Sequence, residues 1–245
     1  MSCAAGVCFV LLGACSQTPV AEGPGTPAAS RTTPPPASST TAGSAASAAG
    51  PISSTARCAD AGAPPGSARR DVGAAYGSPA TLWITDFSVG ITTGRGTGRA
   101  AINSASPLQR VALLVDAQQD GRHQIIVDAG RAAYLYTVSG CTVTPVVGPD
   151  GAPFVFDRGH RRDTGDGVGC SDLGHGRRLV VLLQQHEAGR WTVRRTEIDL
   201  RGDTATPGAS DTVIARSQQD PAWTTAETVS CGDLTADRDG LRAPL

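Results

Sequence analysis

The stretch RVALLVDAQQDGRHQIIVDAGRAAYLYTV, residues 110–138, decides the fold of this chain. It contains three apolar, β-branched runs, at Arg110–Asp116, His123–Asp128 and Ala132–Val138. The runs are separated by Asp120-Gly121 and Ala129-Gly130, which accept the positive φ angles of tight hairpin turns. In the third run, Tyr134, Tyr136 and Val138 share one face, the period of two that is typical of a strand.

The same pattern continues on both sides of this stretch. Further apolar runs follow at Thr81–Asp86, Thr142–Val147, Pro153–Asp157, Arg178–Gln184 and Trp191–Leu200. Short turns such as Asp150-Gly151 and Ala188-Gly189 join several of them. We therefore predict an all-β domain over residues 58–234, an antiparallel hairpin meander that is partly propeller-like or sandwich-like. At most one short helix is expected, within Ser217–Glu227 and with Ser217 as its N-cap.

The first 14 residues are predicted to be a secretion signal. Ala4–Leu12 is apolar but too short to span a bilayer. The following Leu12-Gly13-Ala14-Cys15 resembles the lipobox of bacterial lipoproteins. This resemblance implies that Cys15 is acylated and becomes the first residue of the mature chain. The protein would then be attached by lipid to the extracytoplasmic face of the cell membrane.

The segments that flank the predicted β-domain are poor in core residues. Residues 15–57 are rich in Pro, Ala, Ser and Thr, so we expect a disordered linker after the lipidated cysteine. Residues 235–245 are expected to form a flexible tail. The whole chain has a formal charge of -1, with 21 basic and 22 acidic residues, which excludes nucleic acid as a partner attracted by bulk charge.

Four cysteines fall in the predicted β-domain: Cys58, Cys141, Cys170 and Cys231. Outside the cytoplasm such a set usually forms two disulfides, for which the sequence permits three pairings. We favour Cys141 with Cys170, and Cys58 with Cys231, because the second pair would close the domain end to end. No C-x-x-C pair is present, and the four histidines lack the spacing of zinc ligands.

Two segments resemble successive FG-GAP (VCBS-type) repeats. They are LVDAQQDGRHQIIV at 114–127 and GVGCSDLGHGRRLVV at 167–181. In that family a D-x-D-x-D-G loop between two strands often holds Ca²⁺, and the repeats form propeller blades. The resemblance therefore implies a candidate calcium loop at Asp116 and Asp120, and a shorter counterpart at Asp172.

Both loops have lost acidic residues of this pattern. Gln118 and Gln124 stand where the first repeat would carry carboxylates, and calcium affinity falls as carboxylates are lost. A loop with two of four carboxylates would bind Ca²⁺ at about millimolar concentration at best. We interpret Asp116 and Asp120 as turn formers whose carboxylates accept hydrogen bonds from loop amides, and we predict no metal.

No motif identifies a catalytic residue. Asp163-Thr164-Gly165 is similar to the loop of aspartic proteases, but Arg161 and Arg162 precede it and no second copy exists. We interpret it as an irregular turn. Arg201-Gly202-Asp203 is predicted to be a hairpin turn. Gly94–Arg99 is interpreted as a mobile linker between strands, because it does not join a strand to a helix.

Two functional classes remain open. The first is a non-enzymatic, lipid-anchored envelope protein whose β-domain binds an envelope protein or a wall polymer. The second is an envelope hydrolase whose residues converge only in three dimensions. The basic residues between Arg158 and Arg195 alternate with acidic ones, so we interpret them as a solvated face of the sheet. Trp83, Trp191 and Trp223 are interpreted as core residues or as cover for a disulfide rather than as a sugar platform.

Overall fold

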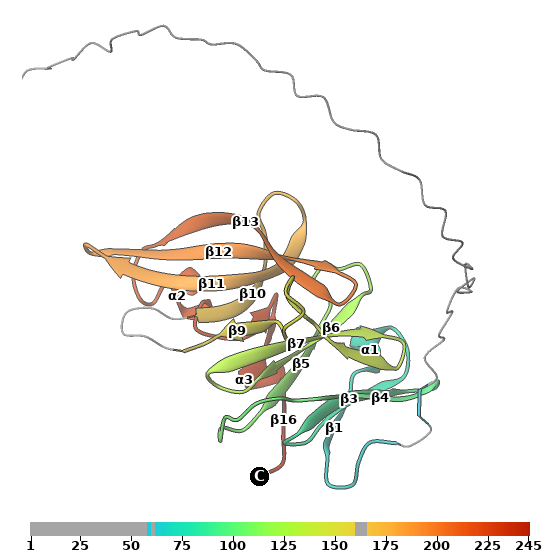
Figure 1. Ribbon diagram of the computed structural model, residues 1–245. Helices are drawn as coiled ribbons and strands as arrows, with labels where there is room; N and C mark the ends of the chain where they lie inside the picture. The colour runs from blue at the N-terminus through green and yellow to red at the C-terminus, as the bar shows by residue number, and fades with distance from the viewer. Residues whose placement is uncertain (1–57, 60–61, 160–165) are drawn as a thin grey trace, which may run out of the picture. The chain divides into compact units, whose positions relative to one another are not determined.

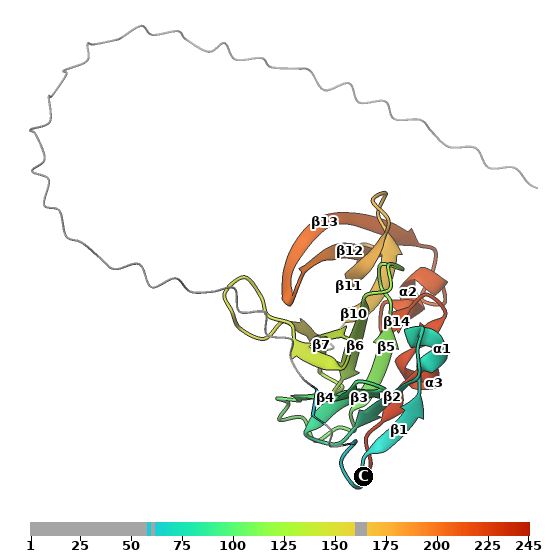
Figure 2. The same ribbon diagram turned by 90° about the vertical axis from the view of Figure 1, so that its right-hand side faces the viewer.

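The computed structural model describes residues 58–59, 62–159 and 166–245. The predicted signal (1–14), Cys15, the linker to residue 57 and Asp163-Thr164-Gly165 lie outside the described residues. The described chain consists mainly of antiparallel sheets stacked in three layers (Figures 1 and 2). The all-β prediction is confirmed, and of its two forms the structure is consistent with the sandwich-like one.

Each layer is a sheet of neighbouring strands. The first has the order β1 (Ala68–Asp71), β2 (Ala80–Ile84), β3 (Ser88–Thr93) and β4 (Gly96–Ala101). The central sheet has the order β16 (Leu241–Arg242), β5 (Val111–Val115), β6 (His123–Asp128), β7 (Ala132–Ser139) and β8 (Thr142–Pro145), with β9 (Val155–Asp157) also paired to β7. The third comprises β10 (Asp166–Asp172), β11 (Arg177–Glu187), β12 (Arg190–Arg201) and β13 (Thr204–Ala215). A two-stranded ribbon joins β14 (Ser230–Cys231) to β15 (Leu234–Thr235).

The central sheet is buried on both faces, whereas the period of two in residues 132–138 predicted cover on at least one. Tyr136 and Val138 point to one side and pack with residues of β2, β3 and β4. Ala133 and Leu135 point to the other side and pack with residues of β10, β11 and β12. Each large side chain buried in this way contributes about 1.5–3 kcal/mol to stability. The two apolar layers on either side of one sheet hold the three sheets together.

The apolar runs of the sequence did not predict five strands with weak apolar patterns, nor the two-residue strands β14, β15 and β16. β1, β3, β4, β10 and β13 carry many Gly, Ala, Ser, Thr or Arg residues. Gly94–Arg99, expected to be a mobile linker, instead provides the β3–β4 turn and the first part of β4. The interpretation as a linker was wrong because the glycines of this segment serve packing: they let β4 approach the central sheet closely. A Cβ atom at Gly98 would lie 1.5 Å from the carbonyl oxygen of Cys141, where β4 meets the central sheet.

The expected disulfide pairing is wrong. The structure pairs Cys58 with Cys141, at a Cα–Cα distance of 5.9 Å, and Cys170 with Cys231, at 4.7 Å. Cys141 lies in the turn between β7 and β8, against the N-terminal segment that begins at Cys58. Cys170 lies in β10, and β14 with Cys231 runs beside that strand. The expectation assumed that a disulfide would join the two ends of the domain. The pairing instead depends on which segments lie side by side in the fold.

The segment 235–245 is ordered in its larger part, so the expected flexible tail is also wrong. It contains α3 (Ala236–Asp239) and β16, which pairs with β5 through Leu241 and Ala112. Leu241 and Ala243 are buried in the core between the first and central sheets. These elements are too short for a repeating pattern of apolar residues to predict them from the sequence. Their burial depends on the open edge of β5, which the sequence does not display.

The structure has more helices than the single one expected, and the N-cap residue of the expected helix is a different one. Besides α3, there are α1 (Gly73–Tyr76) and α2 (Pro221–Thr225), so the structure has three short helices among its described residues. The predicted helical segment holds α2, whose N-cap is Asp220 rather than Ser217. The Asp220 carboxylate accepts a hydrogen bond from the Ala222 amide at 3.0 Å. Within the described part of the chain, no helix has the length and apolar character needed to cross a membrane.

The close contact between β4 and the β7–β8 turn leaves no room for a side chain at Gly98. Gly98→Ala should destabilise the domain by at least about 2 kcal/mol, because the added methyl group overlaps the Cys141 carbonyl. The melting temperature should fall by about 5 °C or more. Gly94→Ala is the matched control, because a Cβ atom there meets no atom within 4 Å. Equal melting temperatures for the two variants would contradict the close approach of these layers.

Candidate functional site

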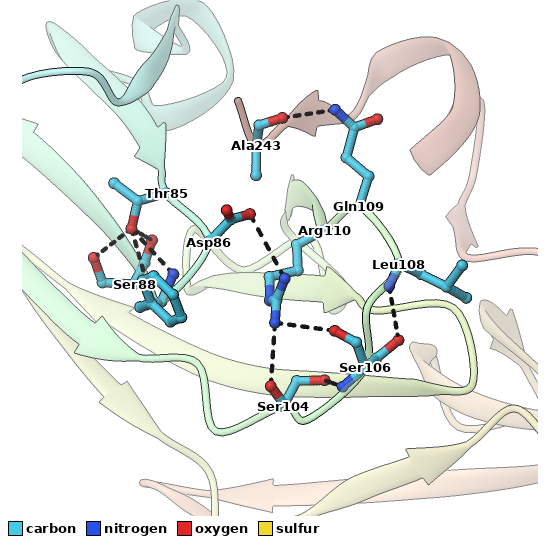
Figure 3. Close-up of polar contacts among 10 residues, drawn as sticks. Thr85, Asp86, Ser88, Ser104, Ser106, Leu108, Gln109, Arg110 and Ala243 are labelled. Atoms are coloured by element: carbon cyan, nitrogen blue, oxygen red, sulfur yellow. Dashed lines mark hydrogen bonds and ion pairs between the residues drawn. The ribbon is translucent and has the colours of Figure 1, made fainter. Parts of the chain in front are cut away.

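A buried arginine organises the loop that leads into β5. Arg110 is 7% exposed, and its guanidinium donates to the carbonyl oxygens of Ser104 at 3.1 Å and Ser106 at 3.2 Å (Figure 3). The same group lies 3.6 Å from the carboxylate of Asp86, in the β2–β3 turn. Charged hydrogen bonds of this kind contribute about 1.5–3 kcal/mol, so Arg110 fixes the path of residues 103–109.

The loop is further fixed by its own side chains. The Ser104 hydroxyl accepts from the Ser106 amide, and the Ser106 hydroxyl accepts from the Leu108 amide, each at 3.2 Å (Figure 3). Gln109 then donates to the carbonyl oxygen of Ala243 at 2.7 Å. The loop is therefore joined to the first sheet at Asp86 and to the C-terminal segment at Ala243.

This fixed loop presents apolar surface to solvent. Leu108 is 49% exposed and lies over Gly130, where a Cβ atom would come within 2.2 Å of the leucine side chain. Beside it is a cavity of about 550 Å³, lined by residues 104–108 together with Arg131, Ala132 and Tyr134. We call Pro107, Leu108, Arg131 and Tyr134 the Leu108 surface. A second exposed apolar side chain is that of Phe87, which is 76% exposed and follows Asp86, the ion-pair partner of Arg110.

The candidate calcium loop lies at the other end of β5. The Asp116 carboxylate accepts hydrogen bonds from the amides of Asp120 at 3.1 Å and Gly121 at 2.9 Å. The Asp120 carboxylate accepts from the Arg122 amide at 2.9 Å. The interpretation of these two residues as turn formers is confirmed. No group of three His, Cys, Asp or Glu residues in the described ranges is arranged as a metal site.

Asp172 forms a similar turn between β10 and β11. Its carboxylate accepts from the Gly174 amide at 2.7 Å and from the Gly176 amide at 3.0 Å. These hydrogen bonds, that of Gly174 above all, lower the pKa of the Asp172 carboxyl below its ordinary value. The carboxylate is thus held in its charged form by the turn that it caps.

The basic residues of the middle of the chain are divided between exposed and buried positions. Arg195 and Asp211 form a two-pronged pair across β12 and β13, and hydrogen bonding to Arg195 lowers the pKa of Asp211. Arg158 instead is buried, pairs with Asp128 and donates to the carbonyl oxygen of Glu227 at 2.7 Å. The interpretation of one solvated face was therefore wrong for Arg158, which joins the central sheet to the segment after α2. Arg161 and Arg162 lie outside the described residues.

The tryptophans are engaged by neighbouring side chains. Trp83 is fully buried against Gly90, and Trp223 is the residue of α2 that packs into the core. Trp191 is stacked on His186, with ring centroids 3.6 Å apart, and forms a T-shaped pair with Trp223, with centroids 4.7 Å apart. Trp83 and Trp223 are therefore buried core residues, as expected, and the half-buried Trp191 packs against the same core as Trp223.

Replacing the buried arginine should release the loop. Arg110→Met leaves two carbonyl oxygens without their donor, so we expect a loss of about 2–3 kcal/mol in unfolding free energy. Amide hydrogen exchange of Ser106 and Leu108 should become faster than in the parent protein. Arg122→Met is the control, because the Arg122 side chain is 79% exposed and lies 3.7 Å from Asp120. Unchanged exchange at both amides in Arg110→Met would contradict this role.

Comparisons with known proteins do not assign the chain to a family. A scan against family models, a search of curated proteins and a search of solved structures each found no match.

Proposed function

We propose that this chain is a lipid-anchored protein of the extracytoplasmic face of the cell membrane, and that its β-domain is a non-enzymatic interaction module. The observation that carries the proposal is the pairing of all four cysteines in the described part of the chain. Structural disulfides persist in oxidising compartments and are rare in the cytosol. The lipobox-like Leu12-Gly13-Ala14-Cys15 supports an attachment point upstream of this domain.

The Leu108 surface supports an interaction with another envelope protein. Leu108 is held on a loop whose conformation is already fixed by Arg110 and two serine hydroxyls. A fixed loop loses little conformational entropy on binding, which favours affinity. Its partner must offer apolar surface to Leu108 and to the neighbouring cavity. Proteins offer such surface more readily than polar wall polysaccharides do.

The lipid anchor is tested by labelling the full-length chain in a bacterial host with a palmitate analogue. The parent chain should incorporate the label. It should also enter the detergent phase on phase separation, because its acyl chains insert into detergent micelles. Cys15→Ala should lose both properties.

Cys8→Ala is the matched control for this experiment, since it removes a nearby cysteine that lies within the apolar run Ala4–Leu12. It should keep the label and the detergent partition. Label retained in Cys15→Ala, or lost equally in both variants, would refute Cys15 as the acylated residue.

The interaction surface is tested by placing a photoreactive phenylalanine analogue at position 108 and irradiating intact cells. We expect a discrete protein adduct, because Leu108 is exposed beside the apolar cavity. The additional substitution Arg110→Met should reduce its yield by releasing the loop. The same analogue at Ile214, which is 63% exposed on β13, is the control. Equal adducts at positions 108 and 214, or adducts with carbohydrate alone, would contradict a protein partner at the Leu108 surface.

A further inference from the structure

A second cavity, of about 420 Å³, lies at the end of β5 opposite the Leu108 loop. Its volume falls within the range of about 300–1,000 Å³ that is typical of small-molecule sites. Three parts of the fold line it: the face of β6, β7 and β8, the β5–β6 loop, and the β12–β13 turn. In contrast to the Leu108 surface, most of its side chains are polar.

The floor of this cavity is a row of polar residues across three strands. Gln124 pairs with Thr137, and Thr137 pairs with Thr144, so all three lie on one face of the central sheet. Ile126 and Leu135, further along the same face, belong to the core shared with the third sheet. The apolar core between these two sheets thus ends at a polar row, where the cavity begins.

The β5–β6 loop forms one wall and is rigidly held. The amide side chain of Gln124 accepts from the Ala117 amide at 3.1 Å and donates to the Arg122 carbonyl at 2.8 Å. Asp116 caps the same loop, as described above. Gln119 has a φ of 57°, which is uncommon for a residue other than glycine. These contacts fix Gln118 at the edge of the cavity.

The β12–β13 turn forms the opposite wall. The Val147 amide donates to the Asp203 carbonyl at 2.8 Å, and the Ala205 amide donates to the Val147 carbonyl at the same distance. These backbone hydrogen bonds fix the turn relative to the central sheet. Leu200 adds an apolar patch to this wall, beside the exposed Asp203. The cavity is therefore preformed by hydrogen bonds of its own walls.

The polar side chains that line the cavity have unused hydrogen-bonding capacity. Within the described ranges, the Gln118 amide group and the hydroxyls of Thr137, Ser139 and Thr144 make no hydrogen bond. The amide and the hydroxyls can each donate and accept. The side chains of Arg122 and Asp203 have opposite charges, and the ring of His123, also in the lining, shares a hydrogen bond of 2.9 Å with the Ala75 carbonyl oxygen. The lining thus offers neutral donors and acceptors, one apolar patch and no excess charge.

We propose that this cavity binds a neutral pyranose unit of an envelope carbohydrate. Sugar hydroxyls both donate and accept, which matches the amide and hydroxyl groups of Gln118, Thr137 and Thr144. The C–H face of a pyranose ring would pack against Leu200. The balanced charge does not favour an anion over a neutral ligand. This site uses residues separate from the Leu108 surface, so failure of either proposal leaves the other testable.

The test is a titration of the full-length chain in a detergent without a sugar headgroup, followed by saturation-transfer NMR. The probes are the methyl pyranosides of glucose, galactose, mannose and N-acetylglucosamine, with methyl glucuronide as the charged counterpart of the glucoside. At least one neutral pyranoside should bind and should bind more tightly than the glucuronide. Thr137→Val and Thr144→Val should each weaken its affinity about 5-fold, the loss expected for one hydrogen bond.

Thr212→Val is the matched control, because Thr212 is exposed on β13, outside the cavity lining. It should leave the affinity within about twofold of the parent value. Neither cavity variant should lower the melting temperature by more than about 2 °C, because neither hydroxyl has a partner in the described chain. Absence of neutral pyranoside binding at concentrations on the order of 10 mM would overturn the proposal. So would tighter binding of the glucuronide, or equal affinity in all three variants.

Discussion

Burial of the central sheet on both faces is the constraint on which the rest of the structure depends. Alternate residues of β7 enter opposite apolar layers, so Tyr136 packs toward the first sheet and Leu135 toward the third. A sheet buried in this way needs apolar side chains in both alternating positions along its strands. β5 and β6 meet this need with runs of Val, Leu and Ile, whereas the outer sheets are covered on one face more than on the other.

The ends of β5 explain where the two candidate sites lie. Arg110 precedes the strand and fixes the loop that carries Leu108, whereas Asp116 follows the strand and caps the loop that carries Gln118. One loop leads into β5 and the other follows it, and β5 itself is immobilised by packing on both faces. This arrangement places one apolar and one polar surface on rigid supports, which lowers the entropy lost on binding.

The disulfides reinforce the layers in different places. Cys58–Cys141 attaches the start of the described domain to the β7–β8 turn, next to the close contact at Gly98. Cys170–Cys231 attaches β10 to the C-terminal segment. Their sequence separations are 83 and 61 residues, for which the loop-entropy model gives about 4 kcal/mol each. Such cross-links support a β-domain that works outside the cell, as we propose, where reducing systems do not maintain free thiols.

The sequence by itself determined the local features. The period of two between Ala132 and Val138 identified a strand that is covered on at least one face, and the Asp116 turn followed from the side-chain chemistry of aspartate. These features depend on residues close together in the chain.

Only the tertiary structure decided the cysteine partners, the pairing of β16 with β5 and the burial of Arg158. It also placed Thr137 and the β12–β13 turn on one cavity. Each of these depends on which sheet edges and faces meet. That order is set by packing between distant segments, which no short-range pattern records.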